Sequence, residues 1–168
     1  MGISKDGILR EKDWWRYGSR GTPKRGLRSD LLEKDLAWYA GFVDGEGCVG
    51  VYKRKDPGSN SLVYYAVLAI SHVEPAPLVE IQSFYSPGVI SIKHVPTKSE
   101  KHRDQCRIDV PQRYLLDTLS ALIPHLRNKT EQAWVTMDFL ITRFSNQYPL
   151  NHKVFQDYCD DLKRLKVA

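Results

Sequence analysis

The sequence predicts a single α+β domain whose core order is helix, two strands, helix, two strands, helix, followed by further helices. Three observations predict this class. Apolar residues recur at helical spacing in several stretches, apolar and polar residues alternate in four short stretches between them, and turn residues or a polar loop join these four into two pairs. Paired strands of this kind form an antiparallel sheet with one face covered by helices and one face open. We therefore expect a four-stranded antiparallel sheet with helices on one side.

The first expected helix spans residues 32–44. Asp30 and Glu33 have the spacing of a capping box, and apolar residues then follow at helical intervals. Gly45 and Gly47 come directly after the last of them and are expected to end the helix.

One face of this helix is almost bare. Ala37, Gly41 and Gly45 recur every four residues, so another backbone can approach that face closely. Asp44 and Glu46 follow at the helix end, and carboxylates are ligands that hard divalent cations take. Two interpretations stay open: ordinary tight packing followed by a turn, or a helix seam that places two metal-binding carboxylates near a symmetry axis.

The remaining elements follow from alternation and turn chemistry. The segment 56–60 is a strong turn signal, Pro75 and Pro77 end the second strand and open a short helix, and Pro124 separates two later helices. We expect strands over 48–55, 62–73, 88–95 and 105–110, and helices over 77–84, 112–122, 129–144 and 151–166.

Alternation along the strands also predicts the two faces of the sheet. Apolar side chains such as Leu68 and Ile70 should face the helices. The open face would be a curved polar surface wide enough to follow a major groove, or an ordinary solvated sheet face. Its expected side chains are Tyr52, Arg54, Tyr65, Ser71, Lys93, Gln105 and Arg107.

Composition and charge favour a soluble domain with a basic N-terminal segment. Hydrophobic content is 42%, charged content is 27%, and no run approaches the roughly 18 apolar residues that span a bilayer. The three cysteines are far apart and form no Cys-x-x-Cys pair, so a zinc site or a disulfide framework is disfavoured. We expect an intracellular protein without membrane contact, in a prokaryotic cytoplasm or an organelle.

The domain is expected to span residues 31–168, after a basic arm over residues 1–30. The arm holds eight Lys or Arg against four Asp or Glu, and Trp14 and Trp15 lie among them. Such a segment suits phosphate contact with stacking on nucleic acid; alternatively, it is a solubilising tail whose tryptophans dock on the domain. The DNA-binding candidates in the arm are Arg16, Arg20, Lys24 and Arg25.

The segment Trp38–Gly47 resembles the signature of the LAGLIDADG homing endonucleases, with Tyr39 to Gly47 lying on the nine motif positions. Four positions are identical to the signature, and Glu46 stands where the family more often has Asp. The likeness covers roughly residues 32–144, over which the expected order of elements agrees with the family core. The identical positions are Ala40, Gly41, Asp44 and Gly47.

The resemblance implies a site-specific endonuclease that cuts both strands of DNA. A single motif copy is similar to the homodimeric branch, in which two motif helices pack across a two-fold axis, the sheet forms a DNA-binding saddle and the target is roughly palindromic. The family's usual role in intron homing would follow. The implied dimer-interface residues are Ala37, Ala40, Gly41 and Asp44.

The resemblance also implies a metal centre and catalytic residues. The carboxylate of Glu46 and the backbone carbonyl of Gly45 would bind Mg²⁺ or another divalent cation, whereas Asp44 would accept hydrogen bonds near the helix end. Glu74 takes the place of a polar residue that orders active-site water, either as a metal ligand or as a group that repels phosphate. Lys129 follows a Pro-x-Leu segment and would support catalysis, unless it is a plain surface lysine.

Some family features and some other chemistries are missing. The family's arginine after the second strand has no clear counterpart, and Arg103 and Arg127 are unplaced substitutes. The histidines lack a His-Glu-x-x-His spacing, and no glycine-rich phosphate loop occurs. A rival hypothesis is a non-cleaving protein on the same scaffold, either an RNA-splicing maturase or a DNA-binding regulator. RNA is therefore a second, less favoured partner beside double-stranded DNA.

Overall fold

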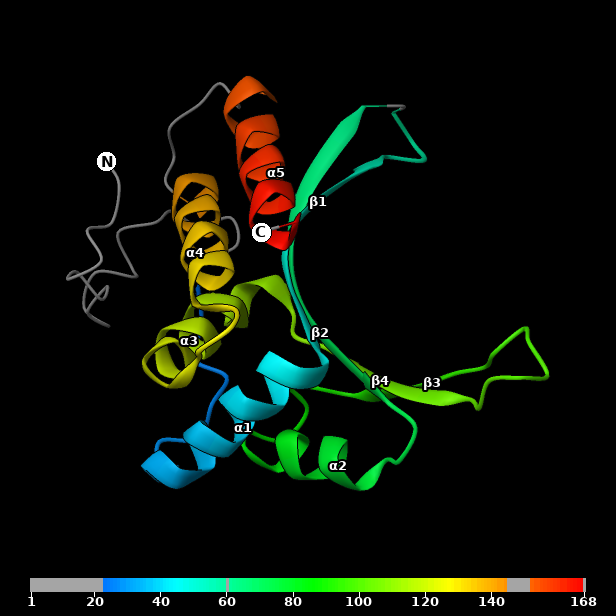
Figure 1. The fold of residues 1–168 in the computed structure, drawn as a ribbon. Helices are drawn as coiled ribbons and strands as arrows, with labels where there is room; N and C mark the ends of the chain where they lie inside the picture. The colour runs from blue at the N-terminus through cyan, green and yellow to red at the C-terminus, as the bar shows by residue number, and fades with distance from the viewer. Residues whose placement is uncertain (1–22, 60, 145–151, 168) are drawn as a thin grey trace.

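The computed structural model describes residues 23–59, 61–144 and 152–167, and its elements follow the expected order (Figure 1). The helices and strands are α1 (Glu33–Glu46), β1 (Gly47–Lys55), β2 (Leu62–His72), α2 (Ala76–Ser83), β3 (Ile92–Val95), β4 (Gln105–Asp109), α3 (Gln112–Leu122), the 3-10 helix η2 (Ile123–His125), α4 (Thr130–Phe144) and α5 (His152–Val167).

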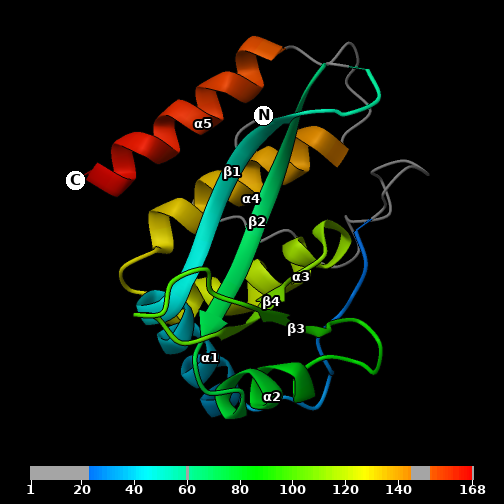
Figure 2. The same cartoon turned by 90° about the vertical axis from the view of Figure 1, so that its right-hand side faces the viewer.

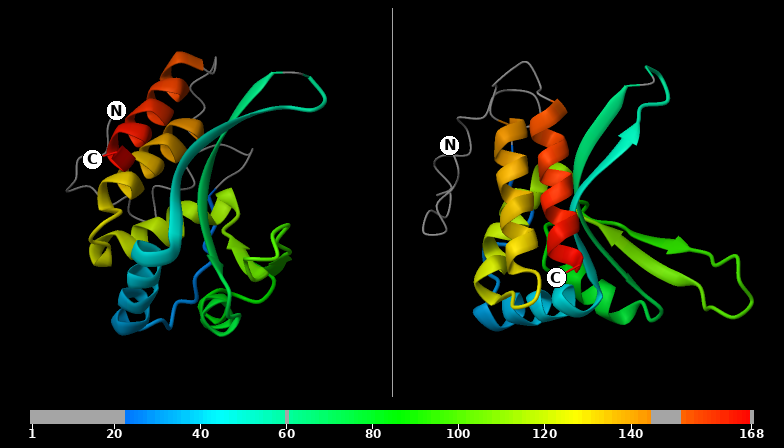
Figure 3. Two further views of the ribbon diagram at one scale, coloured as in Figure 1. Left: turned by 45° about the vertical axis from the view of Figure 1, so that its right-hand side comes forward. Right: turned by 45° about the horizontal axis from the view of Figure 1, so that its top comes forward.

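The four strands form one antiparallel sheet in the order β1-β2-β4-β3, which confirms the predicted fold class. Helices α3, α4 and α5 gather on one side of the sheet, and the β1–β2 and β3–β4 hairpins curve away from them (Figures 1 and 3). The other face of the sheet is therefore concave, and no helix of the described residues covers it.

The core lies between the sheet and the helices. Val49 and Val51 of β1, Leu68 of β2 and Ile108 of β4 are at most 5% exposed and form one cluster with the buried residues of α3 and α4. Burying these side chains is the main favourable term that fixes the helices to this face.

The start of α1 differs from the expected capping box. Leu32 is the N-cap residue, and its N–H donates to the Asp35 carboxylate (3.0 Å). Asp30 instead accepts hydrogen bonds from the Arg28 guanidinium at 2.9 and 2.6 Å. The prediction of an Asp30–Glu33 capping box is therefore wrong, because the arginine two residues earlier binds Asp30.

The end of α1 also differs from the expectation. The helix continues through Gly45 to Glu46, and β1 begins at once with Gly47. A Cβ atom at Gly47 would lie 2.7 Å from the carbonyl oxygen of Val43, so the sharp passage from helix to strand requires glycine there. This passage fixes Glu46 at the junction of α1 and the sheet.

The third strand is shorter than the predicted segment 88–95. Gly88 has a φ of +80°, a left-handed conformation that belongs to a turn, and Ile90 is buried without pairing in the sheet. The carbonyl of Ile90 accepts a hydrogen bond from the Gln82 side chain (2.9 Å), which replaces a ladder bond.

A chain of buried hydroxyl groups ties α1 to α3. The Tyr85 hydroxyl lies 2.8 Å from that of Tyr39 in α1 and 2.9 Å from that of Thr118 in α3. Burial raises the pKa of both tyrosines, so these hydroxyls stay protonated in more alkaline solution than an exposed tyrosine would.

The described part of the N-terminal segment packs on the domain. Both Gly26 and Leu27 donate their backbone N–H groups to the Asp117 carboxylate of α3 (2.8 and 2.9 Å), and Pro23 is buried. Residues from 23 onward thus belong to the folded body, whereas residues 1–22 lie outside the described residues. Within the described chain, no helix is long and apolar enough to cross a membrane.

Candidate functional site

The seven side chains predicted for the open face share one face of the sheet. Tyr52 pairs directly with Tyr65, and Arg107 lies between its neighbours Ser71 and Lys93. Directly paired residues point to the same side, as do alternate residues along a strand, so Arg54 and Gln105 also belong to this face.

Charged groups on this face pair with each other near the β4 end of the sheet. Asp109, which the sequence prediction left out of the open-face set, accepts hydrogen bonds from the Arg107 guanidinium (2.9 and 2.7 Å) and lies 3.6 Å from the Lys93 ammonium. Partial burial acts to raise the pKa of Asp109, but the hydrogen bond from Arg107 and the positive charges of Arg107 and Lys93 together outweigh it, so the pKa is lowered. Asp109 is therefore ionised at neutral pH and orients both cations.

The C-terminal end of α1 is held by the loop before α4. The Asp44 carboxylate accepts three backbone hydrogen bonds, from the N–H groups of Arg127 (2.7 Å), Asn128 (3.1 Å) and Lys129 (3.0 Å). Asp44 thus ties the loop before α4 to the end of α1. A carboxylate near the N-terminus of α4 also complements the dipole of that helix.

Lys129 also points to the end of α1. Its ammonium donates to the carbonyl oxygens of Val43 (2.9 Å) and Asp44 (2.5 Å). A cation at a helix C-terminus is favourable, so Lys129 neutralises the end of α1. It is half-buried, which differs from a plain exposed surface lysine.

Glu46 is the exposed acidic group at this junction. Its carboxylate makes no hydrogen bond or ion pair with any other residue that the structure describes. Gly47, the next residue, pairs with Ile70 near the end of β2, so Glu46 lies at the edge of the sheet. Gly45, whose carbonyl was the second predicted metal ligand, is exposed beside it.

Glu74 lies beyond the end of β2, close to Arg103 of the β3–β4 loop. The Arg103 guanidinium is 4.0 Å from the Glu74 carboxylate, and both side chains are exposed. The Glu74 N–H donates to Nδ1 of His72 (3.0 Å), whose ring contacts Phe42 of α1. Of the two arginines that the sequence left unplaced, Arg103 is thus beside Glu74, while Arg127 contributes its backbone to Asp44.

The bare face of α1 is open in a single chain. Ala37 and Gly41 are exposed, and a Cβ atom at Gly41 or Gly45 would meet no atom within 4 Å. Ala40, which the prediction placed in a dimer interface, is fully buried in the core of its own chain. Its side chain therefore cannot contact a second chain at this face, because the core of its own chain covers it.

The donor set at the α1 end fits a divalent cation that keeps most of its water. In the described part of the chain, no three His, Cys, Asp or Glu side chains are grouped to hold a metal ion. Mg²⁺ is commonly held by one or two carboxylates together with water and substrate phosphates. One free carboxylate and one carbonyl per chain, Glu46 and Gly45, match that pattern.

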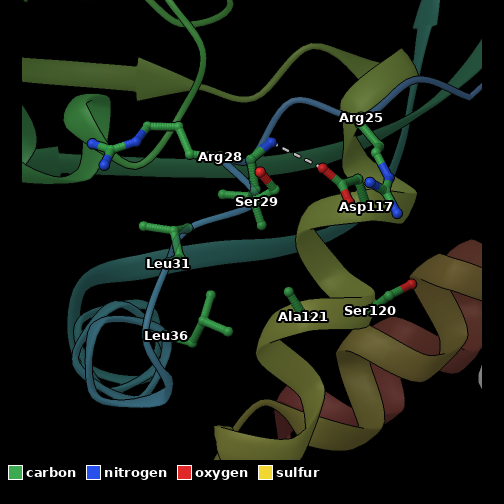
Figure 4. A pocket seen from close by; sticks show the side chains of 9 residues that line it. Arg25, Arg28, Ser29, Leu31, Leu36, Asp117, Ser120 and Ala121 are labelled. Atoms are coloured by element: carbon green, nitrogen blue, oxygen red, sulfur yellow. Dashed lines mark hydrogen bonds between the residues drawn. The ribbon is translucent and has the colours of Figure 1, made fainter.

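The described basic residues of the arm lie away from the open face. Arg25 lines a pocket of about 410 Å³ together with Asp117 and Ser120 of α3, on the helix side of the sheet (Figure 4). Lys24 donates its N–H to the carbonyl of Arg113 at the start of α3 (2.7 Å). Arg16 and Arg20 lie outside the described residues.

Comparison with solved structures gives the same fold. The homing endonuclease I-CvuI, in complex with the I-CreI target in the presence of 2 mM Mg with the DNA not cleaved, has a TM-score of 0.65 and 20% identity over 79% of this chain and 82% of that chain. I-CvuI in complex with its own target and 2 mM Ca has a TM-score of 0.51 and 17% identity over 78% of this chain and 96% of that chain.

No protein-family profile matches the sequence. A search of curated proteins also finds no match. At these identities the structural likeness shows the fold alone, and this fold is the one that the resemblance of the Trp38–Gly47 segment implied.

Proposed function

We propose that this chain is a homing endonuclease of the LAGLIDADG type, which binds double-stranded DNA as a homodimer and hydrolyses both strands with a divalent cation. The observation that carries the proposal is the position of Glu46. An exposed carboxylate without a partner among the described residues stands where the bare face of α1 meets the edge of an open, polar sheet.

The dimer would form through the bare face of α1. Ala37, Gly41 and Gly45 leave room for a second helix backbone, and packing across a two-fold axis would bring two copies of Glu46 close together. Each carboxylate could then serve one strand of the duplex. Because the dimer is symmetric, its target would be roughly palindromic.

Glu46 and the Gly45 carbonyl would hold Mg²⁺ or another divalent cation beside a scissile phosphate. The cation supplies stabilisation of the charge that develops on the reacting phosphate. The Lys129 ammonium donates to two carbonyl oxygens and so offsets the negative end of the α1 dipole. This makes the negative charge of the nearby Glu46 carboxylate more favourable. Arg103 beside Glu74 offers a cation at the same end of the sheet, so Glu74 need not repel phosphate.

The open face would read base edges in the major groove, while basic side chains contact phosphates. It offers donors and acceptors from all four strands, including the Arg107 fork that Asp109 orients. Arg107 has the fixed donor geometry that suits guanine.

The deciding experiment compares wild-type protein with Glu46→Gln on a randomised duplex library in Mg²⁺. Wild type is expected to give paired breaks with a fixed overhang, and the variant is expected to bind the same sequences without cutting them. A chelator should reproduce the variant's behaviour with wild-type protein. Cleavage by the variant at the wild-type rate would contradict the assignment.

A binding protein on the same scaffold is the second candidate. The observation that favours it is that Lys129 and Glu74 each have structural partners, so their positions need no catalytic explanation. Such a protein, a maturase or a regulator, would show no cleavage in the wild type. Affinities for duplex DNA and for structured RNA over a salt series would then identify its ligand.

A further inference from the structure

Helix α5 lies along the edge strand β1, and its Lys166 side chain reaches Tyr52 of the open face. The helix packs on α4 and on β1, the edge strand, where the Lys53 ammonium donates to Gln156 (2.8 Å) (Figure 2). At its C-terminal end, the Lys166 ammonium donates to the Tyr52 hydroxyl (2.7 Å) and lies 4.8 Å from the centre of the Tyr52 ring. Tyr52 belongs to the open face, so α5 contributes a residue to that surface.

The position of Lys166 follows from the packing of α5. Phe155, Cys159 and Leu162 are buried, and Lys166 continues the same helical stripe one turn later. Because the three buried side chains hold this face of α5 against the domain, Lys166 on the same face lies next to β1. Glycine at position 50 leaves space for the Tyr52 ring, since a Cβ atom there would lie 3.3 Å from a carbon of that ring.

This contact determines the direction of the Tyr52 hydroxyl proton. An ammonium group can only donate, so the Tyr52 oxygen accepts from Lys166 and its own proton must point elsewhere. The Cys48 sulfur lies 2.9 Å away and is a weak acceptor. A tyrosine hydroxyl is protonated at neutral pH, and partial burial raises the pKa of Tyr52 further.

The rings of Tyr52 and Tyr65 each have a cation beside them. The Tyr52 and Tyr65 ring centres lie 6.2 Å apart. The Arg54 guanidinium lies 5.4 Å from the Tyr65 ring centre, and the Lys166 ammonium lies 4.8 Å from that of Tyr52. A base that stacked on the ring face that a cation occupies would have to displace that cation. The pair therefore suits hydrogen bonding to base edges better than stacking on unpaired bases.

We propose that Lys166 is a positioning residue that holds the Tyr52 hydroxyl as a hydrogen-bond donor, and that Tyr52 reads one base-edge acceptor in the major groove. The acceptors there are N7 of a purine, O6 of guanine and O4 of thymine. On binding, the hydroxyl exchanges its weak sulfur partner for a stronger oxygen or nitrogen acceptor. This inference rests on the proposed recognition of duplex DNA.

The test is a selection from a randomised duplex library with the full chain, followed by sequencing of the bound fraction at several salt concentrations. The proteins are wild type, Tyr52→Phe, Lys166→Met, the double variant and Lys166→Arg. Arg164→Met is the matched control, because it removes one charge from the same helix end and its partner is Asp161 (3.2 Å). Urea unfolding checks that each variant is folded.

Tyr52→Phe and Lys166→Met should relax base preference at the same target position, by roughly ten-fold in relative affinity. The double variant should be no worse than either single variant, and Lys166→Arg should restore the preference. Arg164→Met should leave the preference unchanged. Each result depends on hydroxyl direction and would not follow from a change in stability.

A uniform loss of affinity in Lys166→Met, with the salt slope reduced by about one, would make Lys166 a phosphate contact and overturn the inference. An unchanged preference in the folded variant would also overturn it. A wild-type protein that enriches no duplex sequence would overturn the proposed function and this inference together.

Discussion

Asp44 and Glu46 are two residues apart, yet the structure gives them different surroundings. The carboxylate of Asp44 accepts three backbone hydrogen bonds from the loop before α4, whereas Glu46 is exposed and unpaired among the described residues. A carboxylate surrounded by backbone donors stabilises the fold, and an exposed one is available to a ligand. The difference arises because Asp44 faces the loop before α4 and Glu46 lies where the chain turns into β1.

This difference predicts that two substitutions change stability by different amounts. Asp44→Ala should lower the free energy of unfolding by about 1–3 kcal/mol, because three backbone N–H groups, of which that of Lys129 is partly buried, lose their acceptor. Glu46→Ala should change it by less than about 0.5 kcal/mol, since the side chain is exposed. Urea unfolding followed by circular dichroism measures both. Equal effects would contradict the separate roles.

In the proposed homodimer, the bare face of α1 would be the element through which the chains associate. Trp38, next to the open position Ala37 on this helix, is 38% exposed. Glycine is unfavourable in a helix interior, and no neighbour within the chain requires it at position 41. The close approach of a helix backbone from a second chain would explain why glycine stands at position 41.

Gly41→Leu should therefore weaken association without unfolding the chain. The side chain meets open space in one protomer and would remove glycine's helix penalty of about 0.8–1 kcal/mol, so the isolated protomer should be at least as stable. In a dimer the same side chain would separate the helices. Sedimentation equilibrium measures the dissociation constant, with Gly58→Leu in the β1–β2 turn as control; equal association in both variants would refute the interface.

The whole molecule has one open, concave sheet face and one face covered by helices (Figure 1). The net charge of +5 favours a polyanionic partner, but the open face also carries Asp109, which orients Arg107 and Lys93. Such a face suits recognition of base edges as well as general attraction. Its curvature comes from the two hairpins, which bend away from the helices.

At this scale we expect a two-fold symmetric complex. Sequences selected from a randomised duplex library should form an inverted repeat, because each protomer would present the same face to one half-site. Light scattering on the complex should give two chains per duplex. An asymmetric target bound by a single chain would contradict the dimer while leaving the fold unaffected.

The sequence by itself determined the local structure and the open face. Helical periodicity gave the bounds of α3, and strict alternation placed all seven expected residues on one face, since both signals depend only on neighbours in the chain. The decapeptide predicted the fold. Alternation failed at Ile90, because a left-handed Gly88 and a side-chain hydrogen bond remove that residue from the sheet.

Only the tertiary structure decided which polar groups meet. Asp44 and the backbone of Arg127 are 83 residues apart in sequence, and Tyr52 and Lys166 are 114 apart. These contacts exist because burial of the apolar stripes fixes how α4 and α5 lie on the sheet, and no local pattern encodes that arrangement. The same packing turned Ala40 inward and left Glu46 exposed at the junction of α1 and β1.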